Sequence, residues 1–204
     1  MIRAWHFVGD TLRDGRPVPQ DGVWLEHDGP LVICQSGLHA SLDPFDALRY
    51  APGPTLCLVE CDGDILEQDD KLVCRRRRIV ARRDATEGLC YFARMQALSV
   101  IHLWDAPDVV LDYLMTGDEA IRAAAAWDAA RATASAAAWD AAGAATASAA
   151  AWYAASAHAW EAAWDAAGAA TAWYAARDAA RKDWHALVVE AFDLPLDEVV
   201  YVVS

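Results

Sequence analysis

The sequence lacks the cysteine patterns that would hold a fold together covalently or through a metal. Its five cysteines form no C-x-x-C pair, and none lies beyond residue 90. An odd number of cysteines without paired spacing argues against a disulfide framework and against a structural zinc site. We therefore expect reduced, buried thiols and no metal in a chain of 204 residues, which is long enough to bury a core unaided.

Basic residues are also scarce. The 17 Lys and Arg residues are outnumbered by 30 Asp and Glu residues, which gives a net charge of −13. Because nucleic-acid binding draws most of its affinity from cationic side chains, this balance argues against general DNA or RNA binding. The exception is the arginine run at residues 75–78. It predicts either a solvated strand edge or an anion site that includes Arg75 and Arg77.

Targeting signals and long apolar runs are missing as well. The N-terminus has no basic start followed by an apolar stretch, so we expect no signal peptide and a cytoplasmic location. Residues 123–180 are more than half alanine, but charges such as Asp128, Arg131 and Asp140 interrupt them and argue against a membrane span. No Walker loop, H-E-x-x-H or G-x-G-x-x-G motif occurs, so we expect a binding protein without a cofactor rather than an enzyme.

In the first half of the chain, short apolar segments alternate with turn signals such as Asp14-Gly15 and Asp62-Gly63-Asp64. This spacing predicts a small, mostly antiparallel sheet. Neither face of residues 72–80 is cleanly apolar, which predicts an edge strand there. The expected strands are residues 2–8, 22–25, 31–34, 55–61 and 72–80.

Three helices are expected beside this sheet. Ser41 or Asp43 can cap a short helix that runs to Tyr50. A capping-box pattern at residues 84–87 predicts a second helix that extends to Ile101. A third is expected from residues 105–108 to Gly117. Together these elements predict an α+β fold, with a first domain over residues 1–115.

The second half, residues 116–192, is an alanine- and tryptophan-rich helical repeat, in which residues 138–147 recur as 163–172. A capping box that starts at Thr116 predicts its beginning. Its seven tryptophans occupy more than one helix face, so a lone exposed helix would leave several indoles in water. We favour helices that fold back near Gly143 and Gly168; the alternative is one long helix packed against other copies of the chain. Residues 193–204 are expected to return to the sheet as a terminal strand.

Two groups of residues are candidates for ligand binding. The densest polar stretch, residues 34–41, ends a predicted strand and opens the short helix that leads to Tyr50; its His39 would either contact a ligand or satisfy local backbone groups. The repeat supplies the second group, whose aromatic rings would either pack in the core or stack a planar ligand beside an arginine. Its members are Trp152, Tyr153, Trp173 and Tyr174.

The chain resembles two groups of proteins. Residues 37–41, 47–50 and 58–60 resemble stretches of ADP-ribosyltransferase folds, with residues 3–6 in place of their nicotinamide-binding first strand. This resemblance implies an NAD-using enzyme in which His6, His39 and Tyr50 hold the nicotinamide nucleotide. Three stretches, 37–41, 100–110 and 113–119, followed by Ala/Trp repeats, resemble uncharacterised proteins of actinobacteria and their phages, which implies an accessory role.

These observations favour a non-catalytic binding or assembly protein. Its N-terminal domain would recognise a host protein or a small nucleotide signal, and the repeat would act as a scaffold. The alternatives are an ADP-ribosyltransferase-like enzyme and a purely structural homo-oligomer.

Overall fold

The computed structural model describes residues 1–99, 101–103, 106–132 and 170–200. The chain divides into two compact units. The sheet unit contains residues 1–85 and the chain from residue 181 onward, and the helical unit contains residues 86–180. The first unit thus ends before residue 115, the expected boundary, and it also recruits a C-terminal segment.

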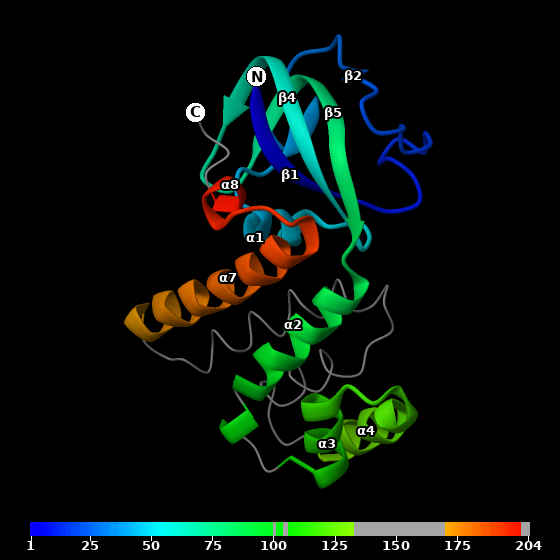
Figure 1. Ribbon diagram of the computed structural model, residues 1–204, viewed down its shortest axis with the longest axis vertical. Helices are drawn as coiled ribbons and strands as arrows, with labels where there is room; N and C mark the ends of the chain where they lie inside the picture. Colours follow the sequence, from blue (N-terminus) through cyan, green and yellow to red (C-terminus); the bar gives the residue numbers. More distant parts are fainter. Residues whose placement is uncertain (100, 104–105, 133–169, 201–204) are drawn as a thin grey trace. The chain divides into compact units, whose positions relative to one another are not determined.

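The sheet unit is built on a five-stranded antiparallel sheet (Figure 1), which confirms the expected α+β class. The strand order is β1-β4-β5-β2, and β3 also pairs with β5. Directly after β3, Ser41 and Trp5 of β1 exchange backbone hydrogen bonds of 2.7 and 2.9 Å, so the sheet curls back onto its first strand. The strands are β1 (Ile2–Val8), β2 (Leu25–Glu26), β3 (Leu38–Ala40), β4 (Thr55–Glu67) and β5 (Leu72–Asp84).

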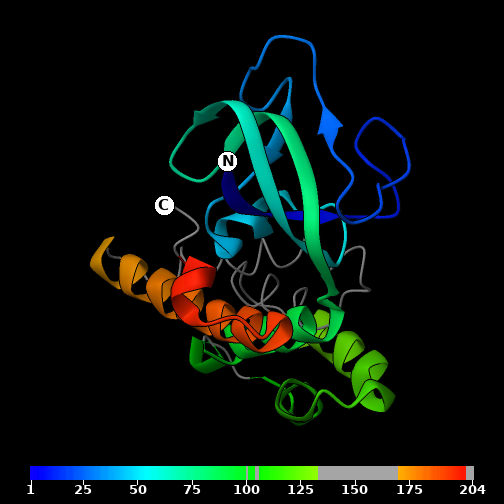
Figure 2. The same ribbon diagram turned by 45° about the horizontal axis from the view of Figure 1, so that its top comes forward.

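The hairpin of β4 and β5 is longer than predicted (Figure 2). The expected turn at residues 62–64 is wrong, because β4 continues through it with a register shift between Asp62 and Ile65. Gly63, whose φ is 76°, absorbs the irregularity. The expected edge position of residues 72–80 is also wrong, since β5 pairs with β4 on one side and with β2 and β3 on the other.

Two other expected strands differ from the structure. Only Leu25–Glu26 pairs in the region of residues 22–25, and residues 31–34 form a tight loop closed by a bridge between Val32 and Ser36. The three-residue strand β3 was not predicted, because so short a segment has no measurable alternation.

Short helices complete the sheet unit. Of the two predicted caps, Ser41 and Asp43, it is Asp43 that begins helix α1 (Pro44–Ala47): its carboxylate accepts a hydrogen bond from the N–H of Phe45 at 2.7 Å. The 3-10 helix η1 (Leu48–Tyr50) follows directly. Helix α8 (Leu196–Val200) replaces the expected terminal strand as far as Val200. Pro195 starts this turn, and Val199 is fully buried, so packing overrides the strand propensity of the valines.

The core of the sheet unit joins the two ends of the chain. Trp5 and Phe7 of β1 are buried, and Trp5 donates from its indole nitrogen to the Val199 carbonyl at 3.1 Å. Trp5 also meets the ring of Phe192 edge-on at 5.1 Å between centroids, and Phe7 lies 6.4 Å from Trp184. The C-terminal segment therefore packs into the sheet unit, and as far as Val200 it does so as helix.

The helical unit contains α2 (Thr86–Ser99), η2 (Ile101–Leu103), α3 (Asp108–Thr116), α4 (Glu119–Ala132) and the first part of α7 (Ala170–Phe192). As predicted, α3 ends at Gly117, which adopts a left-handed φ of 69°. Asp118, rather than Thr116, caps α4 by accepting from the N–H of Ala120 at 2.9 Å.

The helical prediction for the repeat is confirmed at α4 and α7, and residues 133–169 lie outside the described part of the chain. The repeated stretch at residues 138–147 and the fold-back near Gly143 and Gly168 are therefore outside it as well. Within the described ranges, no helix is both long enough and apolar enough to cross a bilayer.

Candidate functional site

The loop before β3 is shaped by its backbone. The Val32 and Ser36 backbones exchange hydrogen bonds of 2.8 and 2.9 Å, which close the loop. Gly37 has a φ of 116°, and a Cβ there would lie only 2.3 Å from Cγ2 of Val73, so only glycine fits. Cys34 also has a positive φ, 66°, which costs a residue with a Cβ about 1 kcal/mol.

His39 holds this loop in place. Its Nε2 accepts a hydrogen bond from the N–H of Cys34 at 2.9 Å, so the ring is neutral with its proton on Nδ1. Burial lowers the pKa of His39, and the charges of Arg77, Arg13 and Lys71 lower it further, against a hydrogen bond with the Gly37 backbone. Because Nε2 is occupied, this imidazole is a positioning residue rather than a free base.

Arg77 lies behind His39. Its side chain is only 6% exposed, and Nη1 donates to the carbonyl oxygen of His39. Burial lowers the pKa of Arg77. Among the described residues no carboxylate pairs with this guanidinium; its acidic neighbours are the thiols of Cys57, Cys61 and Cys74.

His6 belongs to the same group. Its pKa lies well below the usual value because burial disfavours the charged imidazole and because Arg77 and His39 are close. The curled sheet thus brings together His6 from β1, His39 from β3 and Arg77 from β5. His6 and His39, which the sequence analysis named together, therefore lie in one site with Arg77, which it named as part of the arginine run.

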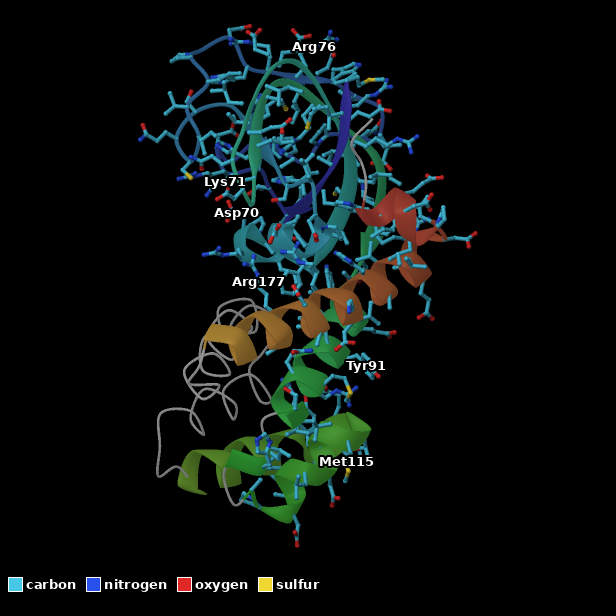
Figure 3. The ribbon with its side chains drawn as sticks, turned by 90° about the vertical axis from the view of Figure 1, so that its left-hand side faces the viewer. Asp70, Lys71, Arg76, Tyr91, Met115 and Arg177 are labelled. Atoms are coloured by element: carbon cyan, nitrogen blue, oxygen red, sulfur yellow. The ribbon has the colours of Figure 1, made fainter. Side chains whose placement is uncertain are left out.

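Tyr50 lies at the end of η1 and is held by two hydrogen bonds. Its hydroxyl donates to Oδ2 of Asp70 at 2.6 Å, and Nζ of Lys71 donates to the hydroxyl oxygen at 2.8 Å. The ammonium also lies 4.6 Å from the ring centroid, and the guanidinium of Arg49 is 3.3 Å from Asp70. Figure 3 shows Asp70 and Lys71 next to one another, away from Arg76. Despite these contacts, Tyr50 stays 43% exposed.

Lys71 lies beside Tyr50 and near the loop of His39. The hydrogen bond to Tyr50 is the largest cause that raises the pKa of Lys71, and the nearby Cys34 thiol raises it further. Lys71 thus contacts Tyr50, and the backbone of Cys34 contacts His39. We call this group the His39 site, and its residues are His6, Cys34, His39, Tyr50, Lys71 and Arg77.

The arginine run contributes one residue to this site. Arg75, the other predicted anion ligand, donates from Nη1 to the carbonyls of His27 at 2.9 Å and Gly29 at 2.5 Å. These hydrogen bonds hold the loop at residues 27–29 against β5. Arg76 and Arg78 lie on the outer face, where each guanidinium is 4.7 Å from the ring centroid of Trp24. Arg76 pairs with Glu26 and Asp62, and Arg78 pairs with Glu60.

The predicted aromatic platforms do not join the site. Trp152 and Tyr153 lie outside the described residues, and Trp173 and Tyr174 lie in α7 at positions whose side chains are not described. Conversely, sequence reasoning missed Lys71. Lys71 directly precedes a predicted strand, which is the one signal that could have drawn attention to it.

The arrangement is suited to holding a ligand. It combines a neutral imidazole, a buried guanidinium, an ammonium and an exposed, fixed phenol ring. In the described ranges, no three His, Cys, Asp or Glu side chains are grouped so that they could hold a metal ion. These groups can supply hydrogen-bond donors, positive charge and a stacking surface.

Comparisons with known proteins give one match. No curated protein and no solved structure is significantly similar to the chain. Residues 2–89 match the family model described as "Domain of unknown function (DUF7666)". That domain covers all five strands, and it contains every residue of the His39 site.

Proposed function

We propose that the chain is a non-catalytic binding or assembly protein whose sheet unit recognises a small ligand or a partner protein at the His39 site. The observation that carries this proposal is the fixed orientation of Tyr50. Two hydrogen bonds immobilise its hydroxyl while 43% of the residue stays exposed. Fixing an exposed ring in advance removes much of the entropy that binding would otherwise cost.

The surroundings support a binding role more than a catalytic one. His39 is engaged by the Cys34 backbone, and the hydroxyl of Tyr50 is engaged by Asp70 and Lys71. A general base needs a lone pair within reach of its substrate, and Nε2 of His39 has none to spare. In this proposal the helical repeat acts as a scaffold, and the resemblance to phage proteins suggests a host protein or a small nucleotide signal as the ligand.

A thermal-shift screen of the full chain tests this proposal. The probes are nucleosides, mononucleotides, dinucleotides and cyclic dinucleotides, because a ligand that binds only the folded state raises the melting temperature. A binding probe should lose its effect in Tyr50→Leu, whereas Tyr91→Leu, a matched exposed tyrosine of the helical unit, should retain it. Equal effects of the two variants would argue against the site, and turnover of NAD by the purified chain would favour the transferase alternative.

A further inference from the structure

The C-terminal segment, residues 181–200, meets the rest of the sheet unit through one side of helix α7. Arg181, Trp184, His185, Val188 and Phe192 follow one another at helical spacing, and at about 100° per residue they form one narrow stripe. All of them except Arg181 are at most 6% exposed. A helix that presents such a stripe is typical of recognition by a complementary protein surface.

The surface that receives this stripe comes from β1, α1 and the end of β5, and Figure 1 shows α1 next to α7. We call it the docking face, and its residues are Trp5, Phe7, Asp43, Pro44, Asp46 and Arg83.

The polar contacts with the docking face are directional and matched in charge. Arg181 donates from Nη1 to Asp43 at 2.9 Å and from Nη2 to Asp46 at 3.1 Å. Nε2 of His185 lies 2.8 Å from Oδ1 of Asp43. The two carboxylates are 13% and 8% exposed, so the docking face holds largely buried negative charge that the segment compensates.

Aromatic rings make the other part of the contact. Phe192 meets Trp5 edge-on at 5.1 Å between ring centroids, and Trp184 lies 6.4 Å from Phe7. The indole nitrogen of Trp184 also donates to the carbonyl of Pro44 at 3.1 Å. An empty docking face would expose apolar rings beside two carboxylates, so it requires an occupant with the chemistry of this segment.

In the sequence, the segment is separated from the docking face by a whole folded unit. Residues 86–180 form the helical unit between them, and the family match ends at residue 89. The contacts are non-covalent, so the same segment of a second copy presents the same groups. The advantage of a chain's own segment is its effective concentration, which decreases as the connection lengthens. A second copy can therefore compete for the docking face.

We propose that two copies of the chain exchange residues 181–200, so that the segment of each copy binds the docking face of the other. The exchanged pair makes every contact described above twice and needs no additional interface, which makes exchange a low-cost route to a closed dimer. Each sheet unit is then complete only with a segment from its partner. This inference does not depend on the His39 site.

Sedimentation equilibrium of the full chain tests whether the dimer forms. The measured mass should double as the concentration increases from the micromolar range to about 1 mM, the range of effective concentrations for linked segments. A mass of one chain at every concentration would overturn the inference.

A pair of charge-reversed variants tests whether the dimer forms by exchange. Arg181→Glu and Asp46→Lys each bring like charges together at the contact, which costs several kcal/mol. The two variants are mixed in denaturant and refolded together, so that neither has to fold alone. In an exchanged pair, one contact is then wild type, and the other joins the two substituted positions with opposite charges. Native mass spectrometry should show the mixed dimer at more than about tenfold over either homodimer.

Lys182→Glu and Asp69→Lys provide the matched control, because both positions are exposed and lie outside the docking contact. Refolded together, these variants should form mixed dimers and homodimers in random proportion. Random proportions for Arg181→Glu with Asp46→Lys as well would show that the chains associate through another surface, and would overturn the inference.

Discussion

Nε2 of His185 lies 2.8 Å from Oδ1 of Asp43, across 142 residues of sequence. The same carboxylate caps α1 through the N–H of Phe45 and pairs with Arg181 at 2.9 Å. Burial by itself raises the pKa of Asp43, but the His185 hydrogen bond and the Arg181 charge outweigh it and hold the pKa below its usual value. One carboxylate thus fixes the start of α1 and the C-terminal part of α7 together.

Arg181 compensates the negative charge of two carboxylates between α1 and α7. It also contacts Asp46 at 3.1 Å, and the side chains of Asp43 and Asp46 are only 13% and 8% exposed. Arg181→Met would leave two largely buried carboxylates with less compensation, so we expect the free energy of unfolding to fall by about 2–4 kcal/mol. Chemical denaturation measures this loss. Lys182→Met, at the exposed neighbouring position, should change stability by less than about 0.5 kcal/mol, and similar losses in both variants would contradict the prediction.

Gly37 is predicted to be irreplaceable. Gly37→Ala would place a Cβ 2.3 Å from Val73 and 2.9 Å from Leu31 while the backbone keeps a φ of 116°. We expect a loss of at least about 2 kcal/mol in the free energy of unfolding, measured by denaturation. Gly15→Ala is the control, since Gly15 has a φ of 82° but no atom within 4 Å of the added Cβ. It should cost about 1 kcal/mol, and an equal loss at both glycines would show that the contact with Val73 does not matter.

Much of this fold follows from local signals. Asp43 followed by Pro44 favours a helix start, and the structure places the start of α1 there. Gly117 favours a helix end, and α3 ends at it. Residues 62–64 have an equally strong turn sequence, but the long pairing of β4 with β5 outweighs it. The segment forms an irregularity within β4 instead of a turn. Local sequence therefore determines the ends of an element where no strand pairing competes with it.

The site could be predicted only in part, for a similar reason. His39 stands in a dense polar stretch, and Tyr50 ends the short helix that follows it, whereas Lys71 reaches Tyr50 across 21 residues and gains its role only when the β4–β5 hairpin forms. Arg75 and Arg77 are equivalent in the sequence pattern. The fold separates them, because Arg75 meets the carbonyls of His27 and Gly29 while Arg77 is buried behind His39.

The two histidines of the site should make stability depend on pH. The pKa values of His6 and His39 are lowered in the folded state, so between those values and the unfolded value, about 6.5, the unfolded chain binds more protons. The contribution of these histidines to the free energy of unfolding should therefore be complete above about pH 6.5. As the pH decreases below about 6.5, the free energy of unfolding should decrease by up to about 1.4 kcal/mol per pH unit for each neutral histidine. Denaturation curves between pH 7.5 and pH 5.5, taken as about one unit on either side of that pKa, measure the slope. An unchanged slope in His6→Gln would contradict the assignment to His6.

The family match ends at residue 89, but the core of the sheet unit does not. Trp5 and Phe7 pack against Phe192 and Trp184, and the indole of Trp5 donates to Val199. A chain that ends at residue 89 would expose these rings, so we expect it to lose cooperative unfolding and near-ultraviolet circular dichroism. Joining residues 181–200 to it through a flexible linker should restore both signals, whereas the same segment with its residue order scrambled should not. Cooperative unfolding of the chain that ends at residue 89, at the same denaturant midpoint as the fusion, would show that the C-terminal segment only covers a core that is already complete.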